Sequence, residues 1–188
     1  MGEVYDQKFS NQNFSEGLLP ASTFEGCTFF ACNFQEADLS GFVFQECMFT
    51  DCNLSNVKLQ KTAFKDCRFM SCKMIGMHFG NCNEFLFEVN FENCVLNHSS
   101  FFNRKMKKTK FTKCSLQETD FTEADLTEAV FADCDLLNAR FERTNLEKAD
   151  FRTAINYSFD PELNKVRKAK FSTDGIAGLL DKYGIQIS

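Results

Sequence analysis

The stretch that decides the fold is residues 121–151, FTEADLTEAVFADCDLLNARFERTNLEKADF, in which Phe or Leu stands at every fifth position. The spacing runs back to Phe9 with one two-residue slip between Phe79 and Leu86. It covers 29 positions, 15 before the slip and 14 after it, and each is Phe, Leu or Met. Helices repeat every 3.6 residues and strands every two, so neither explains a period of five. A short fixed period predicts a solenoid, whose units bury their apolar faces by stacking on one another.

The slot two residues before each apolar centre holds all ten Cys, and its other occupants are mostly small. Such occupants are typical of a second inward position, too cramped for large side chains. The Cys recur 20 residues apart, or 22 across the slip, in two series: Cys27, Cys47 and Cys67, and Cys32, Cys52, Cys72, Cys94, Cys114 and Cys134. This recurrence predicts that four pentads make one coil and that residues 20 apart are stacked neighbours.

The thiols are expected to be reduced and buried, because ten Cys without a secretory signal do not indicate a disulfide framework. Thiols running side by side up one face also have poor geometry for a bridge. The sequence lacks the C-x2-C spacing of zinc sites, so no metal is expected.

The pentads resemble those of the pentapeptide-repeat family, whose unit is a small residue, a polar residue, Leu or Phe, and two polar residues. The clearest copies are Ala37–Gly41, Ala124–Glu128 and Ala149–Thr153, and the pattern covers roughly residues 7–153. The resemblance implies an all-β solenoid, a right-handed quadrilateral β-helix. Four pentads to a coil give about seven coils, and at ~4.8 Å per stacked strand the rod is about 34 Å long.

The period fails after Phe151, so we expect residues 1–154 to form the β-helix and residues 155–188 a short helical cap or dimerisation segment. Asp160 followed by Pro161 is typical of a helix start.

A second helix start is expected at residues 172–174, with Gly184 as its end. Between them, four apolar residues stand at helical spacing: Ile176, Leu179, Leu180 and Tyr183. The segment either caps the open edge of the last coil or pairs two molecules, and the two roles can coexist. The family resemblance favours a homodimer through the C-terminus, as in the gyrase-protecting Qnr proteins and MfpA. The segment around Asp160 also resembles that of McbG, a microcin immunity protein.

Composition excludes several classes of function. The net charge of −5 and the pI near 5.1 argue against direct binding of nucleic acid. No apolar run approaches the roughly 18 residues of a membrane span, so a cytoplasmic protein is expected. The two histidines, His78 and His98, stand in outward slots without a nucleophile, and no Gly-rich phosphate loop is present. We therefore expect a binding protein, not an enzyme, with no cofactor.

An acidic belt between Cys114 and Ala139 permits two interpretations. It contains seven acidic residues and no basic one: Glu118, Asp120, Glu123, Asp125, Glu128, Asp133 and Asp135. The belt is either a surface that mimics DNA or a ladder of ion pairs between residues 20 apart. The expected pairs are Lys108 and Lys148 with Glu128, Lys113 with Asp133, Glu123 with Arg143, Asp120 with Arg140, and Lys105 with Asp125.

One acidic column has no cation in it. Glu46, Asp66 and Glu88 are 20 and 22 residues apart, so three carboxylates should stack in successive coils. Like charges at that spacing destabilise the fold, which makes the column a candidate surface for a basic partner. The slip beside it is either a tolerated insertion, with its aromatic residues folded onto the coil, or a projecting contact loop.

The candidate partner-binding residues are Glu46, Asp66, Glu88, Glu84, Phe85, Phe87, Glu118, Asp120 and Asp125. The resemblance to gyrase-protecting family members implies a protein that binds DNA gyrase or a related type II topoisomerase and confers immunity to a toxin or resistance to quinolones. The alternative is a scaffold with an unrelated protein partner. No membrane partner is expected.

Overall fold

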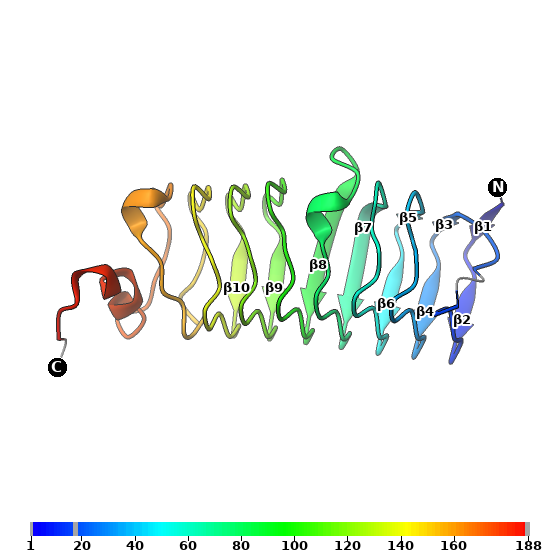
Figure 1. Ribbon diagram of the computed structural model, residues 1–188, viewed down its shortest axis with the longest axis horizontal. Coiled ribbons are helices and arrows are strands. Elements are labelled where there is room, and N and C mark those ends of the chain that lie inside the picture. Colours follow the sequence, from blue (N-terminus) through cyan, green and yellow to red (C-terminus); the bar gives the residue numbers. More distant parts are fainter. Residues whose placement is uncertain (1, 17–18, 187–188) are drawn as a thin grey trace.

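The computed structural model describes residues 2–16 and 19–186, which form a rod of stacked coils with the termini at opposite ends (Figure 1). Ten strands make one sheet. The strands are β1 Glu3–Tyr5, β2 Lys8–Ser10, β3 Thr23–Glu25, β4 Thr28–Phe30, β5 Val43–Gln45, β6 Met48–Thr50, β7 Ala63–Met70, β8 Phe87–Glu92, β9 Lys110–Thr112 and β10 Val130–Ala132. Four short 3-10 helices complete the described elements: η1 Phe79–Asn81, η2 Pro161–Leu163, η3 Ile176–Leu179 and η4 Asp181–Tyr183.

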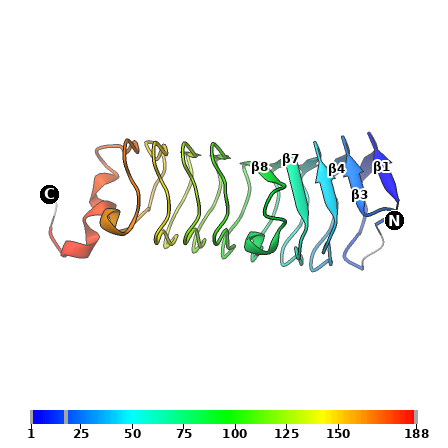
Figure 2. The ribbon, with the colours of Figure 1, turned by 90° about the horizontal axis from the view of Figure 1, so that it is seen from above.

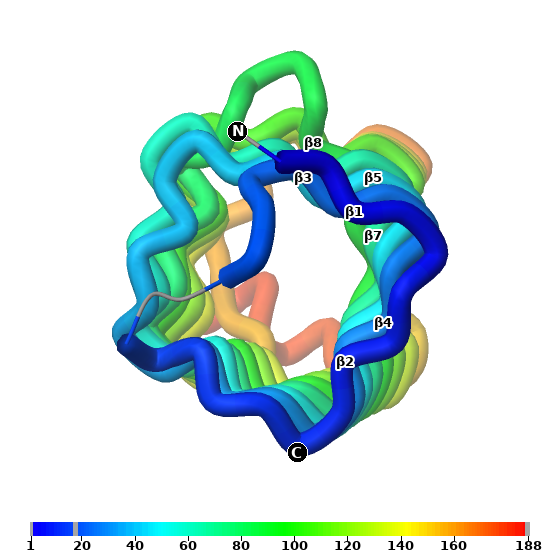
Figure 3. Tube along the Cα trace, turned by 90° about the vertical axis from the view of Figure 1, so that its right-hand side faces the viewer, coloured from blue at the N-terminus to red at the C-terminus, as the bar shows by residue number. Residues whose placement is uncertain are grey.

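Every strand pairs in parallel with a strand of the next coil, and the register confirms the coil of 20 residues. On one face, here the β1 face, β1 pairs with β3, β3 with β5 and β5 with β7, so that Phe24 lies beside Phe44. On the next, the β2 face, pairing continues from β2 through β4, β6, β7 and β8 to β9 and β10. The other two faces are joined by isolated parallel bridges such as Asn33–Asn53 and Asp38–Lys58. The view along the rod shows the four-sided outline (Figure 3).

Columns of inward phenylalanine rings fill the rod. The rings of Phe29 and Phe49 are stacked 4.7 Å apart at 10°, and the ring of Phe44 meets that of Phe49 edge to face at 5.4 Å. One column contains nine rings: Phe9, Phe29, Phe49, Phe69, Phe91, Phe111, Phe131, Phe151 and Phe171. Each aromatic pair contributes about 0.5–1.5 kcal/mol beyond the burial of its area, so stacking between coils holds the rod together.

The residue two places after most centres turns the corner of the coil in a left-handed conformation. In the described residues, 24 non-glycine residues have positive φ, among them Glu46 at 53°, Asp66 at 49° and Glu118 at 55°. Inward centres and left-handed corners therefore alternate along each coil, and the corner side chains point outward. Three of the candidate binding residues stand at such corners.

Cysteine marks one kind of corner. The thiols of nine Cys donate to the carbonyl oxygen two residues earlier, as Cys47 does to Gln45 at 3.3 Å. Eight of the nine follow a strand, and Cys67 lies within β7. At the other kind of corner a backbone turn bond forms instead, as from Ala129 N to Leu126 O at 2.9 Å. All ten Cys are buried and unbridged, as predicted.

The β1 face changes its corner type along the rod. Cys27, Cys47 and Cys67 follow its centres in the N-terminal half, whereas Thr109 and Ala129 take that slot in the C-terminal half and form turn bonds. The slip lies between these two lengths of solenoid.

The coil continues past residue 154, where the failing period predicted an end. Bridges join Asn145 to Lys165 and Asp150 to Lys170, and the ring of Phe171 is stacked on that of Phe151 at 5.4 Å. The period is broken for only two places, Asn156 and Pro161, and resumes at Val166. Tyr157 and Phe159 fill the interior in that interval.

The expected C-terminal helices are single 3-10 turns that lie over the last coil (Figure 2). Asp160 caps η2 by accepting a hydrogen bond from Glu162 N at 2.8 Å, and Gly184 ends η4 with φ of 61°. Lys182 reaches back to Asp160 at 2.8 Å and Glu162 at 2.7 Å, so η4 is tied to η2.

Candidate functional site

The slip forms a loop that projects from the outline of the rod (Figure 3). Asn83 shapes it, because its Oδ1 accepts hydrogen bonds from Phe85 N at 3.0 Å and Leu86 N at 3.2 Å. The backbone of the loop is joined to the coil below by the bond from Asn83 N to Thr62 O at 2.8 Å. Specific hydrogen bonds therefore fix the conformation of the loop.

The two candidate aromatic residues of the loop lie in different places. Phe85 is 85% exposed, whereas Phe87 is partly buried and meets the ring of Phe79 at 5.8 Å. Neither expected alternative holds for both rings, since one folds onto the coil and one projects. Leu86, which the spacing placed at an inward centre, is 39% exposed, and Phe87 takes that place opposite Phe64. The prediction for Leu86 was wrong because a bulge shifts the register before Val89.

Arg104 holds the loop from inside the coil, and the sequence analysis did not identify it as a functional residue. Its guanidinium donates to Asn83 O at 3.0 Å and Gly80 O at 3.3 Å and lies 5.5 Å from the ring centre of Phe87. The signal was present in the sequence, because this large charged residue occupies a slot where the other residues are mostly small.

In the column of Glu46, Asp66 and Glu88, the first two occupy the same left-handed corner in successive coils, and a bulge displaces the corner at Glu88. Glu46 N donates to Lys65 O, and the register places Glu88 opposite the bulged Lys65–Asp66 segment. All three side chains are exposed. Within residues 2–16 and 19–186, none of the three carboxylates forms an ion pair; Glu46 accepts one hydrogen bond, from Gln45 Nε2 at 3.4 Å. Their charges are available to a partner.

Three of the seven carboxylates of the acidic belt, those of Glu123, Asp125 and Glu128, pair with Lys or Arg in the described chain. Glu128 lies between Lys148 at 3.0 Å and Lys108 at 3.9 Å, as predicted, and the hydrogen bond from Lys148 lowers the pKa of that carboxyl group. Arg143 pairs with Glu123 at 2.8 Å, also as predicted.

Other predicted pairs in the belt exchange their partners. Asp125 pairs with Lys107 at 3.5 Å and not with Lys105, whose ammonium group reaches Glu84 in the loop at 3.3 Å. Glu118 meets His98 at 3.2 Å. Asp120 accepts a hydrogen bond from Thr122 N at 3.0 Å and has no cation within ion-pair distance in the described chain, so Arg140 does not pair with it. Likewise, no ion pair joins Lys113 to Asp133 in these residues.

The candidate dimerisation residues divide into two groups. Ile176 and Tyr183 are 47% and 56% exposed, whereas Leu179 packs against the core and Leu180 is half-buried. Two further exposed apolar residues at this end were missed by the sequence analysis, Leu163 and Ile185. Leu179 thus caps the coil, and the exposed side chains leave an apolar surface at the end of the rod.

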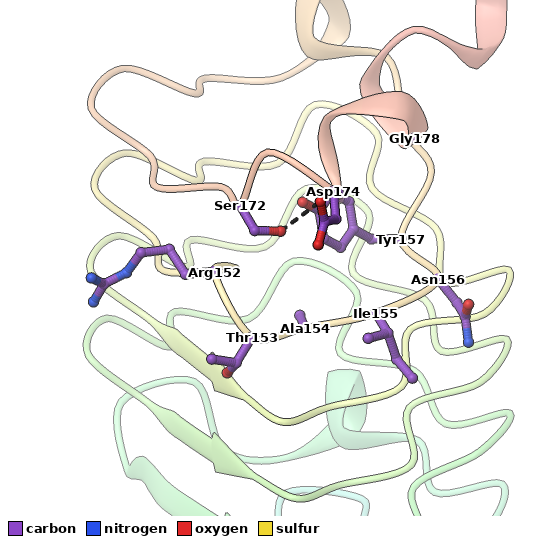
Figure 4. Close-up of a pocket in the computed structure, with 10 residues that line it drawn as sticks. Arg152, Thr153, Ala154, Ile155, Asn156, Tyr157, Ser172, Asp174 and Gly178 are labelled. Carbon is purple, nitrogen blue, oxygen red and sulfur yellow. Dashed lines mark hydrogen bonds between the residues drawn. The ribbon is translucent and has the colours of Figure 1, made fainter. Parts of the chain in front are cut away.

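A hollow of about 460 Å³ lies between the last coil and the C-terminal turns (Figure 4). It is lined by Ile155, Tyr157, Ser172 and Asp174, among others. Arg152 at its edge is already paired with Asp150 at 2.7 Å, and Ser172 Oγ accepts a hydrogen bond from Gly175 N at 3.1 Å. The hollow is the space left where the C-terminal 3-10 turns pack on the last coil.

In the described part of the chain, no three His, Cys, Asp or Glu side chains come together in a way that could hold a metal ion. The helices of this part are all too short to span a bilayer.

The chain matches two family models over most of its length. The model of the pentapeptide repeat region matches residues 42–112, 85–151 and 104–172, and that of pentapeptide repeats in eight copies matches residues 8–46. A comparison with curated proteins gave no match.

This chain is similar to solved structures, and the one with the higher TM-score shows the shared fold. A trypsin-treated variant of QnrB1, a plasmid-mediated fluoroquinolone resistance protein, is 15% identical with a TM-score of 0.65, over 96% of this chain and 98% of that chain. HetL, involved in heterocyst differentiation regulation in the cyanobacterium Nostoc sp. strain PCC 7120, is 14% identical with a TM-score of 0.48, over 90% of this chain and 86% of that chain. The repeat pattern, the four-sided parallel coil and the family models agree, and the chain belongs to the pentapeptide-repeat family.

Proposed function

We propose that this chain is a non-enzymatic binding protein whose partner is DNA gyrase or a related type II topoisomerase, and that it protects the partner from a quinolone or a toxin. The observation that carries the proposal is the column of Glu46, Asp66 and Glu88, three exposed carboxylates with no cation paired to them in the described chain. The fold that the chain shares with the resistance protein QnrB1 supports the class of partner.

The column favours a basic protein surface, such as one that holds DNA. Stacked carboxylates repel one another, and a basic partner relieves that repulsion on binding. Electrostatic potentials of opposite sign on the two proteins also raise the rate of association and disfavour partners of like charge. In this DNA-mimic arrangement the projecting loop adds an apolar contact through Phe85 beside the charges.

The protein acts as a homodimer in this proposal. Ile176 and Tyr183, with Leu163 and Ile185, provide exposed apolar side chains at the C-terminal end, and a second copy would cover them. Exposed apolar patches of this kind mark interaction surfaces.

The test is a gyrase supercoiling assay with and without a quinolone. The native chain is expected to change supercoiling or drug sensitivity, and the variant Glu46→Gln/Asp66→Asn/Glu88→Gln to lose most of that effect. The matched control, Glu123→Gln/Glu128→Gln/Glu147→Gln, removes the same number of charges from the other half of the rod and is expected to retain it. If micromolar native protein leaves both supercoiling and drug sensitivity unchanged, the topoisomerase proposal fails and a scaffold with an unrelated partner takes its place.

A further inference from the structure

Arg104 occupies a corner slot that small residues fill in most coils. The stacked positions in the next coils are Ala124 and Thr144, and those in the preceding coils are Cys82, Thr62 and Phe42, the last being the other large occupant. Arg104 is only 7% exposed, so its guanidinium lies inside the corner. Because an alanine or a threonine closes the same corner in neighbouring coils, the fold does not need an arginine there.

The charge of Arg104 is held without a carboxylate. Its two terminal nitrogens donate to the carbonyl oxygens of Gly80 and Asn83, at the two ends of the turn that begins the loop. The ring of Phe87 lies 5.5 Å from the guanidinium carbon, which is the geometry of a cation–π contact. No ion pair of Arg104 occurs in the described residues, and its Nε has no hydrogen-bond partner there. A buried charge with incomplete compensation costs free energy, so the arrangement does not serve the stability of the coil.

The contacts of the Arg104 guanidinium converge on one element. Gly80, Asn83 and Phe87 belong to the loop, and Asn83 in turn fixes Phe85 and Leu86 through its side chain. Outside the coil, the ion pair between Lys105 and Glu84 holds the same loop at 3.3 Å. Phe85 is thus an exposed aromatic ring on a loop that is fixed from inside and outside.

We propose that Arg104 is the positioning residue that locks residues 80–87 in one conformation and so presents Phe85 as a preformed anchor for an apolar pocket on a partner protein. A side chain fixed before binding loses less conformational entropy when the complex forms, and buried aromatic anchors carry much of the binding free energy at protein interfaces. Asp66 and Glu88 lie beside the loop and would repel a nucleic acid, so the pocket belongs to a protein. This inference rests on the protein-binding function proposed above.

The positioning role of Arg104 is tested without any partner protein. The sequence contains no Trp, so Phe85→Trp introduces a single fluorescent reporter at the loop tip. We expect high fluorescence anisotropy with a small fast component in the otherwise native chain, and a clear drop, with a larger fast component, when Arg104→Ala is added. Arg104→Lys, which lacks the planar fork for two carbonyl oxygens, is expected to fall between them. The surface control Arg143→Ala is expected to leave the anisotropy unchanged.

Unchanged anisotropy in the Arg104→Ala variant would overturn the inference. Arg104→Thr, which copies Thr144, guards against a failure specific to alanine. If neither variant keeps a cooperative unfolding transition, Arg104 is a residue of the fold and the inference is wrong.

The partner arm uses gyrase. Phe85→Ala and Arg104→Ala are each expected to weaken the effect on gyrase at least tenfold, and Arg104→Ala is expected to add little in a chain that already carries Phe85→Ala. Additive losses would show that Arg104 does not act through Phe85. If the native chain has no effect on gyrase, the proposed function is wrong, but the anisotropy result is unaffected. If the anisotropy of the Phe85→Trp reporter does not change when Arg104 is replaced, only this inference is wrong.

Discussion

The ring of Phe79 is stacked on that of Phe101, 22 residues further along the chain, with the ring centres 4.5 Å apart and 4° between the planes. The neighbouring pair Phe101 and Phe121, separated by the ordinary 20 residues, is stacked at 5.3 Å and 3°. The two added residues therefore leave the aromatic column intact. They are absorbed by the loop outside the core, which is why a rigid rod can carry a projecting element.

Removal of one ring from this column is expected to weaken the rod strongly. Phe101→Ala deletes a fully buried side chain and should lower the free energy of unfolding by about 3–5 kcal/mol. Phe102→Ala is the matched control, because its ring is 45% exposed and its loss should cost less than about 0.5 kcal/mol. Urea unfolding followed by circular dichroism measures both, and equal losses would contradict the stacked core.

The buried thiols should resist modification, and Cys47 should make the stability of the fold sensitive to high pH. Burial raises the pKa of Cys47 to about 12, whereas an unfolded thiol ionises near about 8.5. The folded chain thus binds this proton more tightly, so its stability is full below the unfolded pKa and is lost as pH rises from about 8.5 towards 12. Native protein at neutral pH should react slowly with a thiol reagent, and unfolded protein should expose all ten thiols.

Cys47→Thr is the control for the alkaline effect. Threonine fills this slot elsewhere, with Thr144 Oγ1 donating to Phe121 O at 2.9 Å, as Cys47 donates to Phe24 O at 3.5 Å. The variant should fold and lose less stability than the native chain between about pH 8 and about pH 10.5. Rapid labelling of several thiols in the native fold would contradict their burial.

Dimerisation is expected to depend on the exposed residues of the C-terminal end. Ile176→Asp/Tyr183→Asp should halve the mass measured by light scattering, while Leu137→Asp, a change at an exposed residue on the side of the rod, should leave it unchanged. Leu179→Asp is a poorer test because Leu179 packs on the core and its loss loosens the cap. A dimer that survives the double change would locate the interface elsewhere.

Gly178 should be necessary for docking of the cap. A Cβ at this position would lie 1.9 Å from the backbone oxygen of Tyr157, so Gly178→Ala should push η3 off the last coil and cost about 1–3 kcal/mol, as overpacking does. Hydrogen exchange over residues 172–184 reports the loosening. Ala177→Gly is the neighbouring control, because Ala177 is exposed, and protection equal in Gly178→Ala and the native chain would contradict the close contact.

The sequence was sufficient to predict the coil, its four faces and the vertical columns. A period of five with Phe or Leu at each centre has no other packed solution, and the spacing of the Cys fixes the number of pentads in a coil. The columns of Glu46 and Glu128 follow from that spacing alone.

The features that the sequence did not predict depend on three-dimensional contacts between residues outside the five-residue spacing. The coil continues through residues 155–171 because Tyr157 and Phe159 reach the interior from outside the five-residue register, which a strict count cannot detect. The slip was located correctly, but the exchange of Leu86 for Phe87 depends on a bulge. The role of Arg104 depends on carbonyl groups that the loop brings to it, and its size in a small slot was the only sign in the sequence.

The constant register of stacked coils makes the length of this rod adjustable in whole steps. Because Phe111 and Phe131 occupy the same place in successive coils, removal of residues 112–131 would join Phe111 to Ala132 and shorten the molecule by one rung of about 4.8 Å. Every column of side chains on one side of the junction would remain in register with the same column on the other side. The distance between the loop and the C-terminal end would then determine which two points on a partner the protein can contact at the same time.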